Sequence, residues 1–244
     1  MKKTLLLLIG LAGGLLTMAQ TETTTKKDWS KIDISSRSAD HLMIQYGADS
    51  WTGRPDSVRT GGFSRHFNIY FMVDKPFKTN PRFSVGLGAG LGTSNIFFNN
   101  TKVDIKAPVA KLPFTNVDSA DHFAKSKVTT IYLEAPIELR YFANPANPNK
   151  SWKAAIGVKV GTLLKAYTKS KNLVNKNGAS LYGPSYIEKE YNKRFFNGTM
   201  LAVTGRVGYG IISLDAGYQV TGVLKDGAGP SMHKFSMGIT ISGL

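Results

Sequence analysis

Eight segments of the chain alternate between apolar and polar residues at every second position. This period sends successive side chains to opposite faces of a β-strand. No long segment shows the 3.6-residue period of an amphipathic helix. The pattern therefore predicts an all-β fold with strands at residues 42–51, 63–74, 83–93, 128–142, 152–167, 199–209, 212–223 and 234–242.

The connections between these predicted strands differ in length. Residues 75–81, residues 144–149 and the stretch around Gly210 are short, whereas residues 94–127 and 168–198 are long. Short turns at one end and long loops at the other are typical of up-and-down barrels in the bacterial outer membrane. The expected fold is an eight-stranded antiparallel up-and-down transmembrane β-barrel with short periplasmic turns and long extracellular loops.

A soluble eight-stranded barrel of the lipocalin type has the same topology and strand number. It would turn its apolar face inward, and alternation alone does not distinguish the two arrangements. Aromatic residues near strand ends favour the membrane, because such residues form girdles at the two membrane interfaces. These residues are Trp51, Phe63, Tyr141, Trp152 and Tyr209.

The first residues of the chain have the pattern of a secretory signal peptide. Two lysines precede an apolar stretch at residues 5–16, and small residues follow up to Ala19. This stretch is too short to span a bilayer as a helix. We expect cleavage after Ala19, which would divide the chain into a signal peptide (1–19), a periplasmic extension (20–40) and a barrel domain (41–244).

Composition narrows the possible partners. The chain has no cysteine, which excludes disulfides and thiolate metal sites, and its formal net charge is +15. An exported basic protein meets lipid head groups and lipopolysaccharide phosphates rather than nucleic acid. The long loops are expected to bridge such phosphates, with docking of a partner protein as the alternative. Their basic residues are Lys102, Lys106, Lys111, Lys125, Lys127, Lys165, Lys169, Lys171, Lys176, Lys189, Lys193 and Arg194.

Glycine occupies every second position of the stretch SVGLGAGLG, at residues 84–92. A dinucleotide-binding loop needs the spacing Gly-x-Gly-x-x-Gly at a turn from strand to helix, and neither that spacing nor a helix is present. The strict period of two instead predicts a bare inner face of one strand, which leaves room in the lumen. A turn near residue 78 would place Tyr70 opposite Gly86. The lumen glycine face comprises Gly86, Gly88, Gly90 and Gly92.

Charged residues of both signs also have the parity of the expected lumen. A turn within residues 144–149 would place Glu134 opposite Lys159, and opposite charges are expected to pair there because an unpaired buried charge costs several kcal/mol. We expect a structural network rather than a proton or ion pathway. Pro136 has no amide hydrogen and predicts a bulge. The predicted network comprises Glu134, Glu138, Arg140, Lys159, Arg206 and Asp215, with Arg206 opposite Asp215.

Two stretches carry a family resemblance, DHLMIQYGADSW at residues 40–51 with its continuation through residues 55–81, and YLEAPIELRYF at residues 132–142. Here the chain resembles the outer-membrane β-barrel proteins of the Bacteroidetes, which include PorT-like and small OmpA-like members. The resemblance implies a Gram-negative outer-membrane barrel that is exported through a cleaved signal peptide. It also implies the barrel assembly machinery as a partner and allows an accessory role in an envelope secretion complex.

Candidates for catalysis are sparse. Asp49 and His66 are expected near the outer rim, and one long loop contains Asp118, Ser119, Asp121 and His122. We interpret them as ordinary polar residues and expect no enzymatic activity, cofactor or metal site. Eight strands leave an interior just wide enough for side chains. The expected function is that of a small outer-membrane barrel with a largely filled lumen and a structural or interaction role through its extracellular loops. A narrow solute channel, a secretion accessory and, last, a rim-sited hydrolase that uses both histidines are the alternatives.

Overall fold

The computed structural model describes residues 41–56 and 58–243 of the chain. The predicted signal peptide (1–19) and periplasmic extension (20–40) lie outside the described residues. Within the described part, no helix has the length and apolar character needed to cross a membrane.

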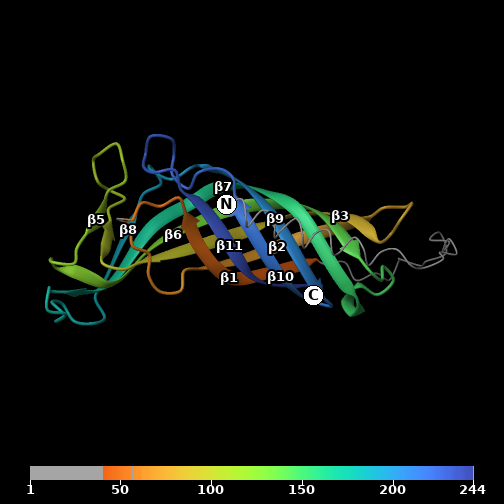
Figure 1. Cartoon of the computed structure of the whole chain (residues 1–244), viewed down its shortest axis with the longest axis horizontal. Helices are drawn as coiled ribbons and strands as arrows, with labels where there is room; N and C mark the ends of the chain where they lie inside the picture. Colours follow the sequence, from red (N-terminus) through yellow and green to blue (C-terminus); the bar gives the residue numbers. More distant parts are fainter. Residues whose placement is uncertain (1–40, 57, 244) are drawn as a thin grey trace, which may run out of the picture. The chain divides into compact units, whose positions relative to one another are not determined.

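Eight long strands form a closed antiparallel ring in chain order, with β1 paired to β11 (Figure 1). The predicted barrel topology is confirmed. The strands of the ring are β1 (Leu42–Thr52), β2 (Arg65–Pro76), β3 (Phe83–Phe98), β6 (His122–Phe142), β7 (Trp152–Val174), β9 (Thr199–Tyr209), β10 (Ile212–Gln219) and β11 (His233–Ser242).

Shorter elements belong to the connections. A 3-10 turn at Pro148–Lys150 joins β6 to β7 at the end of the barrel that carries short turns. At the opposite, long-loop end, β4 (Thr101–Val103) and β5 (Phe114–Asn116) pair with each other, and β8 (Ile187–Tyr191) pairs with β7. The long connections therefore carry strand structure of their own.

Three strands extend beyond their predicted bounds toward the long-loop end. β3 continues to Phe98, β6 begins at His122 and β7 continues to Val174. The extensions pair with one another, as Phe98 does with Ser126. Alternation of apolar and polar residues fades in these stretches, which is why the sequence pattern missed them.

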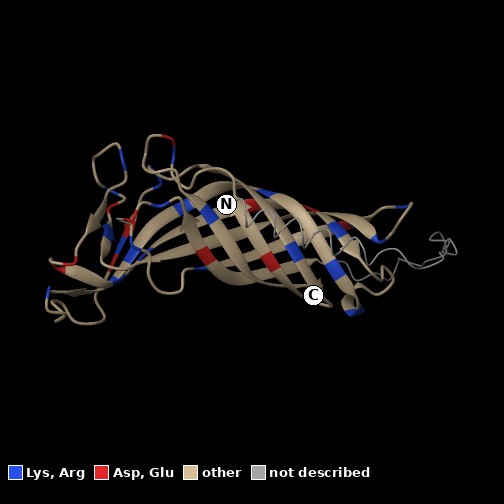
Figure 2. Ribbon diagram, in the orientation of Figure 1, with Lys and Arg blue, Asp and Glu red and all other residues tan. Residues whose placement is uncertain are grey.

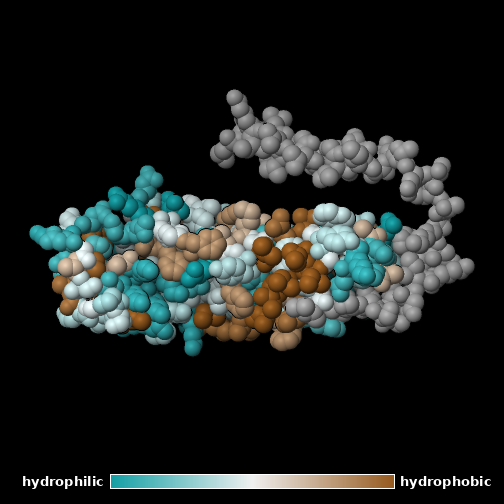
Figure 3. All heavy atoms as spheres, turned by 90° about the horizontal axis from the view of Figure 1, so that it is seen from below, coloured by the Kyte–Doolittle hydropathy of each residue, from teal (hydrophilic) through white to brown (hydrophobic). Residues whose placement is uncertain are grey.

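The two faces of the barrel wall have opposite character. Outward-facing residues such as Leu87, Ile156 and Leu214 are 52%, 67% and 64% exposed, whereas Glu134 and Arg140, which point inward, are buried. Figure 3 shows apolar residues gathered along the middle of the wall and hydrophilic residues at the long-loop end. This arrangement is the reverse of a soluble barrel, whose apolar face points inward.

The height of the apolar surface can be followed along β7. Outward positions are largely apolar from Trp152 to Leu164. With a rise of about 3.3 Å per residue and a tilt of about 45°, this stretch covers roughly 28 Å along the barrel axis. That height is close to the apolar band of barrels that cross a bilayer, about 25 Å.

Aromatic side chains mark the short-turn end of this band. Trp152 packs edge-on against Tyr209 with ring centroids 5.8 Å apart, and Phe83 lies 5.3 Å from Tyr141. The prediction that Trp51 belongs to a girdle is wrong, because this side chain points inward and is only 3% exposed. The reason is its parity in β1, where the buried positions are the odd-numbered ones.

Candidate functional site

The polar interior of the barrel is built around the glycine-rich strand β3. Gly86, Gly88, Gly90 and Gly92 all have the inward parity of the strand. Tyr70 on β2 pairs with Gly90, not with Gly86 as the sequence prediction had it. The turn between the two strands is centred two residues later than predicted. Because moving the centre of a turn by one residue changes the pairing partner by two residues, the partner of Tyr70 is four residues farther along β3.

Neighbouring side chains occupy the space that these glycines leave. A Cβ atom at Gly86 would lie 2.5 Å from Nε of Arg140, and one at Gly92 would collide with the carboxylate of Glu134. Met72 and Tyr70 fill the corresponding positions at Gly88 and Gly90. The absence of side chains on β3 is therefore matched by large side chains from β2 and β6.

The first interior cluster joins β2, β6 and β7. Tyr70 donates its hydroxyl hydrogen to Oε2 of Glu134 at 2.5 Å, and Nζ of Lys159 lies 3.0 Å from the same carboxylate oxygen. Lys159 also donates to the hydroxyl oxygen of Tyr70 at 3.0 Å. All three side chains are buried. The ammonium, the carboxylate and the phenol thus satisfy one another within the barrel.

The pairing of Glu134 with Lys159 differs in register from the prediction. Lys159 lies directly opposite Pro136, and Glu134 lies opposite Gly161, so the ion pair is diagonal. The β6–β7 turn is centred later than the sequence suggested. The bulge expected at Pro136 is also wrong: the register of β6 and β7 shifts between Ile131 and Tyr132, nearer the long-loop end.

A second cluster surrounds Glu138, close to the short-turn end. Its carboxylate accepts hydrogen bonds from Nε of Arg140 at 2.8 Å and from Nη2 of Arg206 at 3.0 Å. Arg140 also reaches Asp74 on β2 at 3.4 Å, and Arg206 donates to Ser242 on β11 at 3.2 Å. Charges from opposite sides of the ring are therefore linked across the interior.

Asp215 stands at the edge of this second cluster. It pairs with Arg206 in the backbone register of β9 and β10, as the tight turn predicted. Its carboxylate accepts a hydrogen bond from Thr240 at 2.7 Å, while the guanidinium of Arg206 reaches toward Glu138. The backbone register of Arg206 and Asp215 was therefore predicted correctly, but their side chains bind other partners.

A third cluster near the long-loop end holds one of the catalytic candidates. Nδ1 of His66 lies 2.8 Å from Oδ1 of Asp49, and Ser94 donates its hydroxyl hydrogen to the other oxygen of the same carboxylate. The carboxylate lies between the serine and the histidine. In a catalytic triad the histidine occupies that middle position, so that it can accept the serine proton.

The other candidate residues lie elsewhere. His122 begins β6 at the long-loop end, where Nδ1 lies 2.9 Å from the carbonyl oxygen of Ala120. Asp118, exposed in the same connection, forms an ion pair of 2.9 Å with Arg59. Hydrogen bonds from Asn116 and Asn100, together with this ion pair, keep the pKa of Asp118 below its usual value. In the described part of the chain, no three potential ligands among His, Asp and Glu are grouped to hold a metal ion.

A small cavity remains among the interior clusters. Its volume is ≈ 20 Å³, which is room for one or two water molecules. Its walls include Gln45, His66, Tyr70, Glu138 and Lys159.

The long connections form an apolar cap over the long-loop end of the barrel, a feature that the sequence reasoning missed. Backbone hydrogen bonds tie the connections together, from Leu112 to Ala228 at 2.8 Å and from Lys225 to Phe195 at 2.9 Å. Short groups of apolar residues within the lysine-rich connections are the sequence feature that could have indicated this cap. The cap core consists of buried residues from wall and connections: Trp51, Val58, Ile96, Phe98, Val103, Ile105, Leu112, Val128, Tyr132, Leu163, Ala166, Phe195, Phe196, Met200, Val223, Leu224, Ala228 and Met232.

Comparison with known proteins agrees with this architecture. A family model described as "Outer membrane protein beta-barrel domain" matches residues 7–221. No curated protein matches the sequence.

Proposed function

The chain belongs to the outer-membrane β-barrel proteins, and on this premise we propose that it is a closed barrel with a structural or interaction role rather than a pore or an enzyme. Its short turns face the periplasm and its long loops the outside of the cell. In this proposal the lumen is filled by the protein's own side chains, and contacts with other molecules are made at the extracellular end.

The main support for a closed lumen is the burial of the interior clusters. The side chains of Tyr70, Glu134 and Arg140 are at most 2% exposed, although they lie on the concave side of the wall. Ion pairs and hydrogen bonds join strands from both halves of the ring at this level. An eight-stranded barrel has an interior just wide enough for such side chains.

The cap core provides a second barrier. Phe195 and Phe196 are fully buried at the long-loop end, beneath the connections. A solute would therefore have to displace apolar packing before it met the polar clusters. This arrangement favours the closed barrel over a narrow solute channel.

A rim-sited hydrolase finds little support in the same geometry. His66 and His122 occupy separate environments, one buried against Asp49 and the other at the start of β6. An accessory role in an envelope secretion complex rests on the PorT-like resemblance and would use the extracellular loops or the periplasmic side. We also propose export through a cleaved signal peptide at residues 1–19 and insertion by the barrel assembly machinery.

Planar-bilayer recordings test the closed barrel. The purified protein should migrate differently on denaturing gels before and after boiling, which shows that it is folded, and should give no stable conductance steps. An open porin in the same bilayers provides the positive control. Stable openings from the folded wild-type protein would overturn the proposal.

A further inference from the structure

Lysines of the two long connections meet on three neighbouring strands at the extracellular end. Lys127 on β6 lies directly opposite Lys169 on β7, and Lys169 lies opposite Lys189 on β8. One step farther out, Lys125 is opposite Lys171. Directly opposed residues in a sheet have Cβ atoms only about 4.5–5.5 Å apart, and like charges in such positions repel each other.

These lysines point away from the barrel interior. Lys127 precedes Val128 and Lys169 follows Thr168, and both of these neighbours are buried and point inward. Arg65 on β2 joins them: its guanidinium carbon lies 5.3 Å from the centre of the Phe97 ring, and Nζ of Lys127 lies 5.6 Å from the same ring. We name this surface the outer basic patch. It comprises Arg65, Lys125, Lys127, Lys169, Lys171 and Lys189.

The acidic residues of β8 face the other way. Glu188 lies opposite Ser170 and Glu190 opposite Thr168, and both glutamates line a cavity on the inner side of the strands. Burial and, after it, the positive charges of Lys169, Arg65 and Lys189 lower the pKa of Lys127, which lies beyond the apolar band. The outer basic patch therefore concentrates positive charge that the acidic residues of β8 do not offset.

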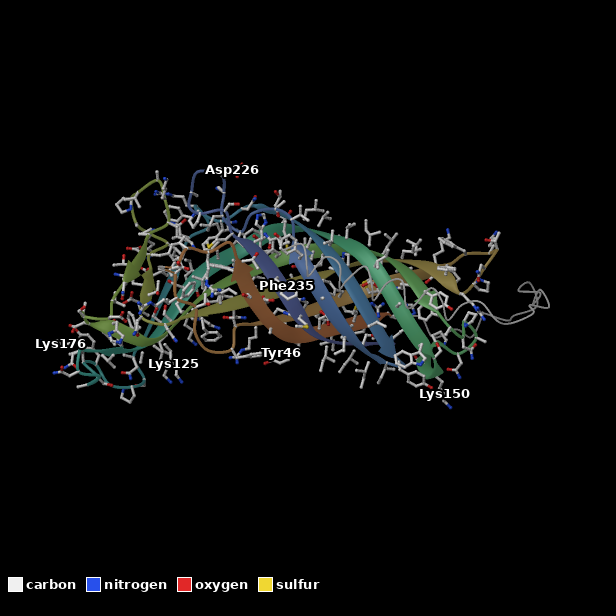
Figure 4. The ribbon with its side chains drawn as sticks, viewed as in Figure 1. Tyr46, Lys125, Lys150, Lys176, Asp226 and Phe235 are labelled. Carbon is white, nitrogen blue, oxygen red and sulfur yellow. The ribbon has the colours of Figure 1, made fainter. Side chains whose placement is uncertain are left out.

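The position of the patch relative to the apolar band indicates what it meets. Along β6, read from the short-turn end, the outward residues are apolar up to Ile131, and Lys127 lies four residues beyond it toward the long-loop end. At about 3.3 Å per residue and a tilt of about 45°, Lys127 lies roughly 13 Å along the strand beyond the band, which is about 9 Å along the barrel axis. Figure 2 shows basic residues on the strands at this end, and Figure 4 shows Lys125 there, far from Lys150 at the opposite end. In the membrane orientation of the proposed function, this is the level of the head groups of the outer leaflet.

Side chains within the patch are held in place. Nζ of Lys127 donates to Oδ1 of Asn95 at 2.7 Å, and Nζ of Lys189 lies 5.6 Å from the centre of the Tyr167 ring. Ammonium and guanidinium groups that are already positioned form charge-assisted hydrogen bonds to phosphate at a smaller entropic cost. The rings of Phe97 and Tyr167 add apolar surface between the charges.

We propose that the outer basic patch is a binding site for the phosphate groups of a phosphorylated glycolipid of the outer leaflet, the lipid A part of lipopolysaccharide. The proposal rests on the membrane orientation in the proposed function and selects, from the many lysines of the loops, the few that converge on the lipid-facing wall. Two phosphates on one sugar head group suit a patch of paired lysines better than the single phosphodiester of a phospholipid.

Nanodiscs that contain the full-length protein, with and without bisphosphorylated lipid A, test this site. Native mass spectrometry would count lipid A molecules retained by the wild type and by the variant Lys127→Gln/Lys169→Gln/Lys189→Gln. Each lysine near a membrane surface contributes enough attraction that losing three should weaken retention by about 100-fold. The matched control is Lys111→Gln/Lys176→Gln/Lys225→Gln, which removes the same charge from exposed loop positions and should retain lipid A as the wild type does.

Competition experiments in the same nanodiscs identify which phosphate compound occupies the site. Competition by phosphatidylglycerol or by inorganic phosphate at the same concentration as lipid A would overturn the glycolipid site, as would equal retention by the two triple variants. Heat-modifiable migration of each variant shows that it is folded. Conductance is recorded separately, so that a failure of the closed barrel and a failure of the lipid site are distinguished.

Discussion

Glu134 on β6 and Lys159 on β7 are two residues out of direct register, and their side chains still form an ion pair of 3.0 Å inside the barrel. Glycines on both sides make this contact possible. A Cβ atom at Gly92 would collide with the carboxylate of Glu134, and one at Gly161 would lie 3.3 Å from its Cγ. The carboxylate thus lies between two bare backbones and reaches diagonally to the lysine.

Replacing Glu134 with alanine should destabilise the barrel by about 3–5 kcal/mol, because it leaves the ammonium of Lys159 buried without its carboxylate. Unfolding by urea in detergent, followed by tryptophan fluorescence, measures the loss. The double variant Glu134→Leu/Lys159→Met should recover most of the stability, since it removes both charges together. An unchanged free energy of unfolding in Glu134→Ala would count against the role of the pair.

Gly92→Ala should also destabilise the barrel, although it adds only one methyl group. The new Cβ would occupy the position of the Glu134 carboxylate, and overpacking of this kind typically costs about 1–3 kcal/mol. Gly205→Ala is the matched control, because its Cβ would meet nothing nearer than a carbonyl oxygen at 3.9 Å. Equal urea midpoints for the two variants would contradict the interior packing described for β3.

Phe196→Ala should loosen the cap while leaving the barrel folded. The ring is fully buried in the cap core, and removal of a buried phenylalanine side chain typically costs about 3–5 kcal/mol. We expect faster trypsin cleavage in the lysine-rich connections, with heat-modifiable migration retained. Leu181→Ala, at an exposed position of a connection, should cleave like the wild type; if Phe196→Ala does too, the cap is not held by this core.

Lipids that carry bromine on their acyl chains should distinguish the two tryptophans of the barrel. Trp152 is exposed at the short-turn end of the apolar band, whereas Trp51 is buried against Phe98 with ring centroids 5.7 Å apart. Trp29→Phe/Trp51→Phe leaves Trp152, whose fluorescence should be strongly quenched. Trp29→Phe/Trp152→Phe leaves Trp51, which should be largely protected. Strong quenching of Trp51 would mean that it faces lipid after all.

Residues of β3 show how much of the fold is readable from sequence. The period of two in residues 84–92 correctly predicted that the glycines share a face, because side-chain direction in a strand follows from local backbone geometry. The pairing of Tyr70 was not predictable with the same certainty. It depends on the centre of the turn, and a displacement of two residues moved the partner from Gly86 to Gly90.

The sequence by itself determined the eight strands within the apolar band, their parity and the polar character of the interior, since these features follow from alternation along a single strand; it did not determine the extensions of β3, β6 and β7, where alternation fades. The tertiary structure alone decided which side chains meet. Arg206 turns toward Glu138 although Asp215 is its register partner, because several strands converge on one narrow interior. In the tertiary structure Trp51 is likewise buried beneath the cap, and Lys127, Lys169 and Lys189 lie side by side. These contacts join residues far apart in the chain, and only closure of the ring and the pairing of its extensions bring them together.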